Sequence, residues 1–147
     1  MTTISTTPAA TQQLVTFSLD AEEYGIAIGR VQEIIRHSPS RPVPGRPEEL
    51  EGVINLRGRI IPVMDLRARL GIGGAAPEEA KVVITEVDDR TVGIVVDDVR
   101  EVITIDLADT EPPPPCTLVG DGDAIESVAK VGDRLLVVLD AVRLLAQ

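Results

Sequence analysis

Aromatic residues are almost absent from this sequence: Phe17 and Tyr24 are the whole set, and tryptophan does not occur. A surface that binds single-stranded nucleic acid by stacking bases needs aromatic side chains, so that class of protein is excluded. Acidic residues outnumber basic ones by 24 to 14, and the formal net charge is −10 at pH 7. Because a field of this sign repels phosphate groups, nucleic acids and anionic membranes are unfavourable partners. We expect the partners to be proteins.

Cysteine and histidine occur once each, at Cys116 and His37. One thiol cannot form an internal disulfide or, by itself, a tetrahedral zinc site, and a single free cysteine is typical of a reducing compartment. His37 has no acid or thiol neighbour in the sequence, so we expect it in a solvated loop. Catalytic triads, Cys–His pairs and phosphate-binding loops are also missing. The sequence therefore predicts no catalytic residues, no metal and no cofactor.

Long apolar runs are missing as well. None approaches the roughly 20 residues that a membrane-spanning helix needs, and the first residues lack the basic and apolar regions of a secretory leader. We therefore expect a cytoplasmic protein with no membrane insertion. Residues 1–13, rich in Thr, Ala and Gln, are expected to form a disordered tail.

Three short motifs carry weak functional signals. The glycines within 71–76 lack the flanking strand and helix of a dinucleotide-binding turn, so we interpret this segment as a linker. The Asp-Gly-Asp at 121–123 lacks the remaining ligands of a calcium loop. The four prolines at 112–115 could present a polyproline ligand, although a stiff crossover between strands is the favoured interpretation.

An internal repeat begins at Leu14. Residues 14–28 alternate apolar and polar side chains around a polar turn, which predicts a β-hairpin, and two apolar segments around the polar turn at 88–90 predict a second hairpin over 81–96. Residues 24–35 align with 92–103 at an offset of 68, and 51–65 align with 126–140 at an offset of 75. The difference places seven extra residues in the proline-containing loop of the second copy, where added length costs little.

The two copies, about 14–74 and 81–146, share the order hairpin, linker, hairpin and helical turn. Each helical turn is expected to begin at an N-cap aspartate, Asp65 or Asp140, and the first to end at Gly71. A copy of this size makes a marginal core alone, so the two should pack together as one domain over 14–146. The predicted fold class is all-β, with two small β-barrels related by approximate twofold symmetry. The repeat leaves open whether strands are exchanged between the barrels.

One departure from the repeat is informative. Arg57 stands in a predicted hairpin turn where the second copy has Gly132. The arginine either solvates the turn or pairs with Glu33, whose neighbours alternate apolar and polar. A fixed arginine–carboxylate pair beside an apolar strip is typical of an oriented protein interface.

These segments together resemble the CheW family of chemotaxis coupling proteins. The resemblance rests on Val-Gln-Glu-Ile at 31–34, Glu-Gly-Val-Ile-Asn-Leu-Arg-Gly at 51–58 with the apolar strand that follows, and Val-Gly-Ile-Val-Val-Asp-Asp-Val at 92–99, in family order and spacing. It covers the chain from about Leu14 to Leu145. One departure is Ser127, at a place where the family often has glycine.

The resemblance implies two SH3-like five-stranded barrels and a non-catalytic adaptor. Such an adaptor links the cytoplasmic tip of a transmembrane chemoreceptor to the regulatory domain of the histidine kinase CheA, which shares this fold. The kinase contact is implied mainly for the second barrel, without assigned residues. The implied receptor-binding groove between the barrels comprises Val31, Glu33, Arg57, Val82, Val99 and Val102.

Two other classes of function remain open from the residues alone. A small-molecule binding module would use the space between the barrels as its pocket. An enzyme is disfavoured, because no nucleophile, base or metal set can be assembled from the sequence.

Overall fold

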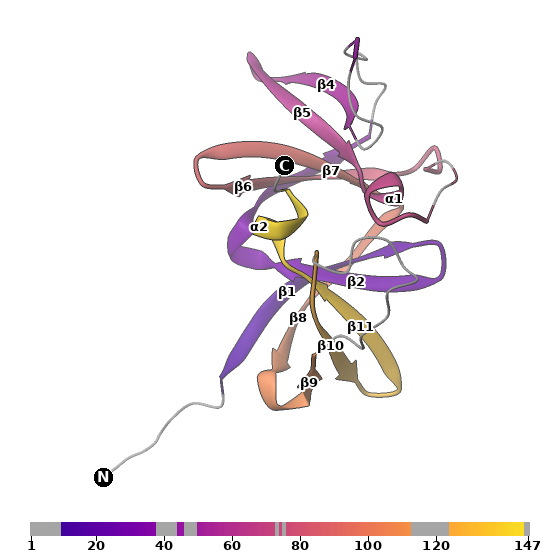
Figure 1. The fold of residues 1–147 in the computed structure, drawn as a ribbon, viewed down its shortest axis with the longest axis vertical. Coiled ribbons are helices and arrows are strands. Elements are labelled where there is room, and N and C mark those ends of the chain that lie inside the picture. Colours follow the sequence, from indigo (N-terminus) through magenta and orange to yellow (C-terminus); the bar gives the residue numbers. More distant parts are fainter. Residues whose placement is uncertain are drawn as a thin grey trace.

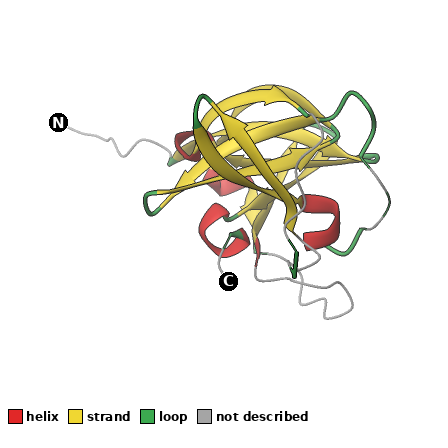
Figure 2. Cartoon of the chain, turned by 90° about the horizontal axis from the view of Figure 1, so that it is seen from above, coloured by secondary structure: helices red, strands yellow, loops and turns green. Residues whose placement is uncertain are grey.

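The protein is built almost entirely of strands, with short helical turns at their ends (Figures 1 and 2). This computed structural model describes residues 10–37, 44–45, 50–72, 74, 76–112 and 124–145 of the 147-residue chain. The strands are β1 (Thr11–Leu19), β2 (Glu22–Ala27), β3 (Val31–Arg36), β4 (Leu50–Leu56), β5 (Arg59–Asp65), β6 (Lys81–Val87), β7 (Arg90–Val96), β8 (Asp98–Asp106), β9 (Thr110–Glu111), β10 (Ile125–Val131) and β11 (Arg134–Leu139). The helical turns are η1 (Ile28–Arg30), α1 (Leu66–Arg69), η2 (Leu107–Asp109) and α2 (Ala141–Leu144).

The strands form two sheets, each curled into an SH3-like barrel. Barrel 1 is the five-stranded sheet, in the order β3-β6-β7-β5-β4, and it occupies the upper half of Figure 1. Barrel 2 is the six-stranded sheet, in the order β8-β1-β2-β11-β10-β9. The predicted all-β fold of two SH3-like barrels is confirmed. The short strand β9 makes barrel 2 six-stranded rather than five-stranded.

The barrels do not coincide with the two sequence repeats, because the copies exchange their first hairpins. β1 and β2 come from the first copy but pair with β8 and β11, whereas β6 and β7 come from the second copy and pair with β3 and β5. The exchange is symmetric: Gly25 lies opposite Val138, and Gly93 lies opposite Val63. The offset of 68 relates Gly25 to Gly93, and the offset of 75 relates Val63 to Val138. The exchanged strands therefore pair in the same register in both barrels, as the predicted twofold relation requires.

The buried apolar side chains form three clusters. One fills barrel 1 around Val63, Val82 and Ile84, and another fills barrel 2 around Leu14 and Leu136. The largest cluster, called the central core here, lies between the barrels and takes side chains from both sheets and both α-helices. Its buried members are Val15, Phe17, Leu19, Ile26, Met64, Leu66, Leu70, Val83, Val87, Ile94, Val96, Ala124, Leu139, Ala141, Leu144 and Leu145. Because both barrels contribute to this core, we expect them to unfold together.

Both predicted N-caps are confirmed. The Asp65 carboxylate accepts from the backbone N–H groups of Arg67 and Ala68, and the Asp140 carboxylate accepts from those of Val142 and Arg143. These bonds satisfy amide groups that the first helical turn leaves without partners. Gly71 follows α1 with a φ of 75°, the left-handed conformation expected of a C-terminal glycine.

Residues 11–13, expected to belong to a disordered tail, instead begin β1, which pairs with β8 from Thr11 onward. Because residues 11–13 are polar, hydrophobic periodicity did not predict a strand there. Backbone pairing with β8 places them in β1. Residues 1–9, Cys116, three of the four prolines and the Asp-Gly-Asp motif lie outside the described residues. Within the described part of the chain, no helix has the length and apolar character needed to cross a membrane.

Candidate functional site

The first residues of β3 and β8 occupy equivalent positions in the two copies of the repeat. Val31 and Val99, related by the offset of 68, are half-buried and pack against the central core from the two barrels. Three residues along each strand, Ile34 and Val102 are both exposed, and 53% of Val102 is accessible to solvent. The two strands thus present a row of apolar side chains that grades from half-buried to open.

Val82 does not belong to this surface, which corrects the sequence-based assignment. It is only 1% exposed and packs inside barrel 1 with Val63, Ile84 and Val95. β6 lies between β3 and β7, with the barrel interior on one face and the central core on the other. Because both faces are apolar, alternation could not reveal which valines of this strand reach the surface.

Glu33 and Arg57 form the ion pair that the sequence suggested. Arg57 Nη1 donates to Glu33 Oε2 at 2.6 Å, and Nη2 donates to Oε1 at 2.8 Å. These hydrogen bonds hold the pKa of the Glu33 carboxyl below its ordinary value and raise the pKa of Arg57. Arg57 and Gly58 both have positive φ, 52° and 85°, as the two-residue turn between β4 and β5 requires. The pair therefore joins the two edges of barrel 1.

His37 is not a solvated loop residue, because the fold gives it an acidic neighbour. Its Nε2 lies 2.9 Å from Glu51 Oε2, and its backbone N–H donates to the Ala80 carbonyl. His37 follows β3 and Glu51 lies near the start of β4, so this contact also joins the edges of barrel 1. A separation of 14 residues hid the contact from sequence reasoning.

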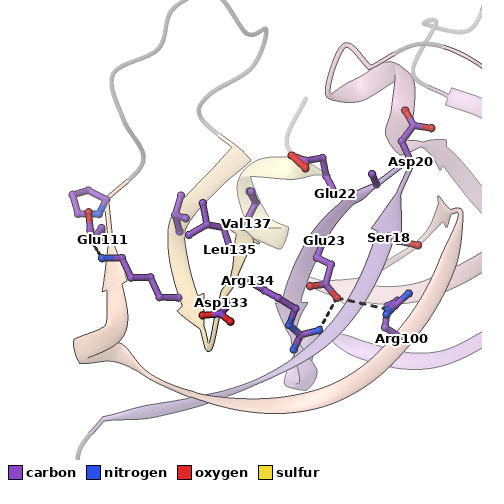
Figure 3. Close-up of a pocket in the computed structure, with 14 residues that line it drawn as sticks. Ser18, Asp20, Glu22, Glu23, Arg100, Glu111, Asp133, Arg134, Leu135 and Val137 are labelled. Carbon is purple, nitrogen blue, oxygen red and sulfur yellow. Dashed lines mark hydrogen bonds and ion pairs between the residues drawn. The ribbon is translucent and has the colours of Figure 1, made fainter.

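A surface pocket of about 1100 Å³ lies on barrel 2, and sequence reasoning did not find it (Figure 3). Its apolar part includes Val128, Leu135 and Val137, of which Leu135 is 63% exposed. Val128 and Val137 are a cross-strand pair of β10 and β11. The full lining is Ser18, Asp20, Ala21, Glu22, Glu23, Arg100, Glu111, Pro112, Val128, Lys130, Asp133, Arg134, Leu135 and Val137.

Charged side chains surround the apolar part of this pocket. Glu23 lies between two arginines, 3.2 Å from Arg134 and 3.7 Å from Arg100, as Figure 3 shows. Lys130 pairs with Glu111 at 3.0 Å on the opposite side. An apolar centre with a charged rim is the usual composition of a protein-binding surface.

The signal for this pocket was present in the repeat. The offset of 75 relates Leu135 to Ile60, which is also exposed, and relates Val137 to Pro62. Leu135 and Ile60 are 63% and 66% exposed and fill neither barrel interior, whereas Val137 packs in part against the central core. The two copies therefore share one exposed apolar position.

The apolar centre and charged rim of the pocket have the composition of a protein-binding surface. Among the described residues, no three His, Cys, Asp or Glu side chains gather closely enough to hold a metal ion. The space between the barrels, where a small-molecule pocket was considered, contains the buried side chains of the central core. The surface of the described residues includes the Glu33–Arg57 pair, an apolar row and a pocket with a charged rim.

Comparison with known proteins agrees with these features. The family model described as "CheW-like domain" matches residues 13–147. The chain is 37% identical to the chemotaxis protein CheW of Treponema pallidum, over 87% of this chain and 78% of that protein. It is 35% identical to the chemotaxis protein CheW of Klebsiella aerogenes, over 92% and 82% of the two chains. The crystal structure of the scaffolding protein TtCheW from Thermoanaerobacter tengcongensis superposes with a TM-score of 0.81 at 40% identity, covering 88% of this chain and 89% of that one. Family model, relatives and fold agree, and the chain belongs to the CheW family.

Proposed function

We propose that this protein is a non-catalytic chemotaxis adaptor that couples the cytoplasmic tip of transmembrane chemoreceptors to the histidine kinase CheA. The observation that supports the proposal is the presence of two separate surface features on one shared core, the apolar row that includes exposed Val102 and the pocket that includes exposed Leu135. An adaptor changes no bond; it contributes binding free energy to one arrangement of its partners over another. The protein would act in the cytoplasm, at the receptor arrays.

The receptor surface in this proposal is the part of the apolar row formed by Val31, Val99 and Val102. A receptor tip is a helical hairpin, and an apolar helix face docks on such a row through side chains spaced three and four residues apart. The Glu33–Arg57 pair would lie beside the row, and its bidentate hydrogen bonds would fix polar groups that orient an incoming helix. The exposure of Val102 and the half-burial of Val31 and Val99 support this arrangement.

The kinase surface in this proposal is the pocket on barrel 2. Leu135 provides an apolar contact that a partner side chain can cover, and the surrounding ion pairs can exchange partners across an interface. This location agrees with the expectation, from family resemblance, that the second barrel carries the kinase contact.

Calorimetric titration of two variants tests both surfaces at once. Val102→Asp and Leu135→Asp each place a charge at an exposed position, so neither change buries an unpaired charge. We expect Val102→Asp to weaken binding of a receptor-tip hairpin at least about tenfold and to leave binding of the CheA regulatory domain unchanged. Leu135→Asp should have the opposite pattern, so each variant is the control for the other.

The outcomes separate clearly. If both variants lose both partners, the two surfaces are not distinct and the assignment of residues fails. If the unaltered protein binds neither a receptor tip nor a CheA regulatory domain from its own host, the adaptor function itself is refuted.

A further inference from the structure

A buried arginine ties barrel 1 to a turn of barrel 2. The side chain of Arg67, in α1, is only 9% exposed. Its Nε donates to Asp97 Oδ1 at 3.1 Å, and its Nη2 donates to Asp97 Oδ2 at 2.6 Å and to Asp20 Oδ1 at 2.5 Å. These contacts raise the pKa of Arg67 above its ordinary value, chiefly through the hydrogen bonds to Asp97. The planar guanidinium holds two carboxylates at once, which an ammonium group cannot do with the same geometry.

The two carboxylates belong to places where the chain changes direction. Asp97 connects β7 of barrel 1 to β8 of barrel 2, and its N–H donates to the Ser18 carbonyl at 3.0 Å. Asp20 lies in the turn between β1 and β2, with a φ of 55°. The Asp20 N–H donates to Asp97 Oδ2 at 2.7 Å. The β1–β2 turn is therefore held by groups outside its own hairpin.

This turn forms one wall of the barrel 2 pocket. Asp20 and Glu22 line the pocket, and Glu23 follows them at the start of β2 (Figure 3). Glu23 in turn holds Arg100 and Arg134 at the rim. A displacement of the turn would move Glu23 and both arginines that it positions.

The second copy of the repeat has no counterpart of this arginine. At the equivalent turn of barrel 1, Asp88 and Asp89 both have positive φ, 51° and 66°, a geometry that matches the twist of a two-residue hairpin without outside support. The residue equivalent to Arg67 in the second copy is Val142, which lies in α2 with part of its side chain exposed. Only one side of the internal twofold axis carries the ion cluster, so a requirement of the barrel fold does not explain it.

We propose that Arg67 is a positioning residue for the kinase-binding pocket. By holding Asp20 and Asp97, it fixes the β1–β2 turn and with it the wall and rim of the pocket. The barrel that carries the Glu33–Arg57 pair thereby determines the shape of the binding surface on the other barrel. This inference rests on the proposed kinase contact at the pocket.

Arg67→Lys is the first test variant. Lysine keeps a positive charge beside the two carboxylates but loses the planar fork that bonds both. Arg69→Lys is the matched control, because Arg69 lies in the same helix but donates to the carbonyls of Leu144 and Arg143 rather than to the turn.

A second pair of variants approaches the turn from its other side. Asp20→Asn removes the charge that Arg67 holds, and asparagine tolerates positive φ as aspartate does. The Asp20 side chain is 59% exposed, so this change leaves no buried group without solvent access. Asp88→Asn is the control, with the same substitution at the equivalent position and nearly the same φ.

Two measurements on each folded variant decide the matter. Amide hydrogen exchange by NMR, without kinase, reports on the Asp20 N–H that donates to Asp97. Calorimetry reports the affinity for the CheA regulatory domain. We expect Arg67→Lys and Asp20→Asn to accelerate exchange at Asp20 and to weaken kinase binding by about threefold to tenfold, while both controls stay near the unaltered protein.

Two results would overturn the inference, and a third would refute the kinase contact on which it rests. Unchanged exchange at Asp20 would show that Arg67 does not hold the turn. Faster exchange with unchanged kinase affinity would show that the turn does not shape the binding surface. Failure of the unaltered protein to bind the kinase would refute the proposed contact instead, and the kinase-free exchange data keep that failure distinct. If Arg67→Lys does not fold, Asp20→Asn and its control carry the test alone.

Discussion

The interior of barrel 1 offers a sharp test through a single close contact. A Cβ atom at Gly93 would lie 2.7 Å from Val82 Cγ1, closer than such atoms approach in proteins, while Ile84 and Val63 would remain at ordinary distances. The backbone of Gly93 is not in the left-handed region, so alanine is allowed there by conformation. We therefore expect Gly93→Ala to be destabilising only because of the clash with Val82.

The second change removes the clashing atom. Val82→Ala deletes two methyl groups from a side chain that is 1% exposed. At about 0.8 kcal/mol for each buried carbon, plus a cavity term, the single change should cost about 2 kcal/mol. In a chain of this size, that corresponds to a fall in the midpoint of thermal unfolding of roughly 5–8 °C.

The double variant is the informative one. With Val82 shortened, the new Cβ at position 93 occupies part of the vacated space, so the two costs should not add. We expect the double variant to be more stable than the sum of the single changes by about 1–2 kcal/mol. Urea unfolding of the four proteins measures this coupling directly.

Two controls accompany the cycle. At the equivalent Gly25, an added Cβ would lie 3.2 Å from Leu14 Cδ1, the far end of a flexible side chain, so Gly25→Ala should cost less than Gly93→Ala. Receptor affinity should be unaffected by Val82→Ala once the protein is folded. Strict additivity in the cycle, or a loss of receptor binding without a loss of stability, would refute the placement of Val82 in the interior.

Three further predictions concern the ion pair and the helix caps. Glu33→Gln and Arg57→Gln should each weaken receptor binding by about tenfold, and the double variant should bind no more weakly than either single variant. A calorimetric double-mutant cycle measures this, and effects that multiply in the double variant would contradict the coupling. Because the pKa of Glu33 is lowered, the pair is formed above the ordinary carboxyl value and is lost as pH falls through the lower folded value. Receptor affinity should therefore be constant from pH 6 to pH 8, and a decline within that interval in titrations across pH would contradict this. Asp140→Ala should lower stability by about 1 kcal/mol in urea unfolding, because α2 loses its N-cap, and an unchanged midpoint would show that the cap is dispensable.

The fold class followed from local patterns because strands and turns leave short-range signals. Alternation and polar turns predicted the hairpins, and both aspartate caps formed where the sequence placed them. The Glu33–Arg57 pair was one of two alternatives that the sequence left open for Arg57, and the structure decided between them. Each of these features depends on neighbours in sequence or on comparison of the two copies.

Hairpin exchange was invisible to the same reasoning. β1 and β2 carry the same alternation whether they pair within their own copy or with the other one, so only the tertiary pairing distinguishes the two folds. Val82 was misassigned for a related reason, because its strand has apolar partners on both faces. The contact of His37 with Glu51 likewise depends on how the edges of barrel 1 meet.

By itself, then, the sequence determined the repeat, the strands, the caps and the family to which the chain belongs. The tertiary structure alone decided which valines are surface and which are core, where the barrel 2 pocket lies, and that Arg67 links the two barrels. The physical reason is the range of the interactions involved. Alternation, capping and turn chemistry act over a few residues, whereas burial and ion pairing depend on which distant strands the fold brings together.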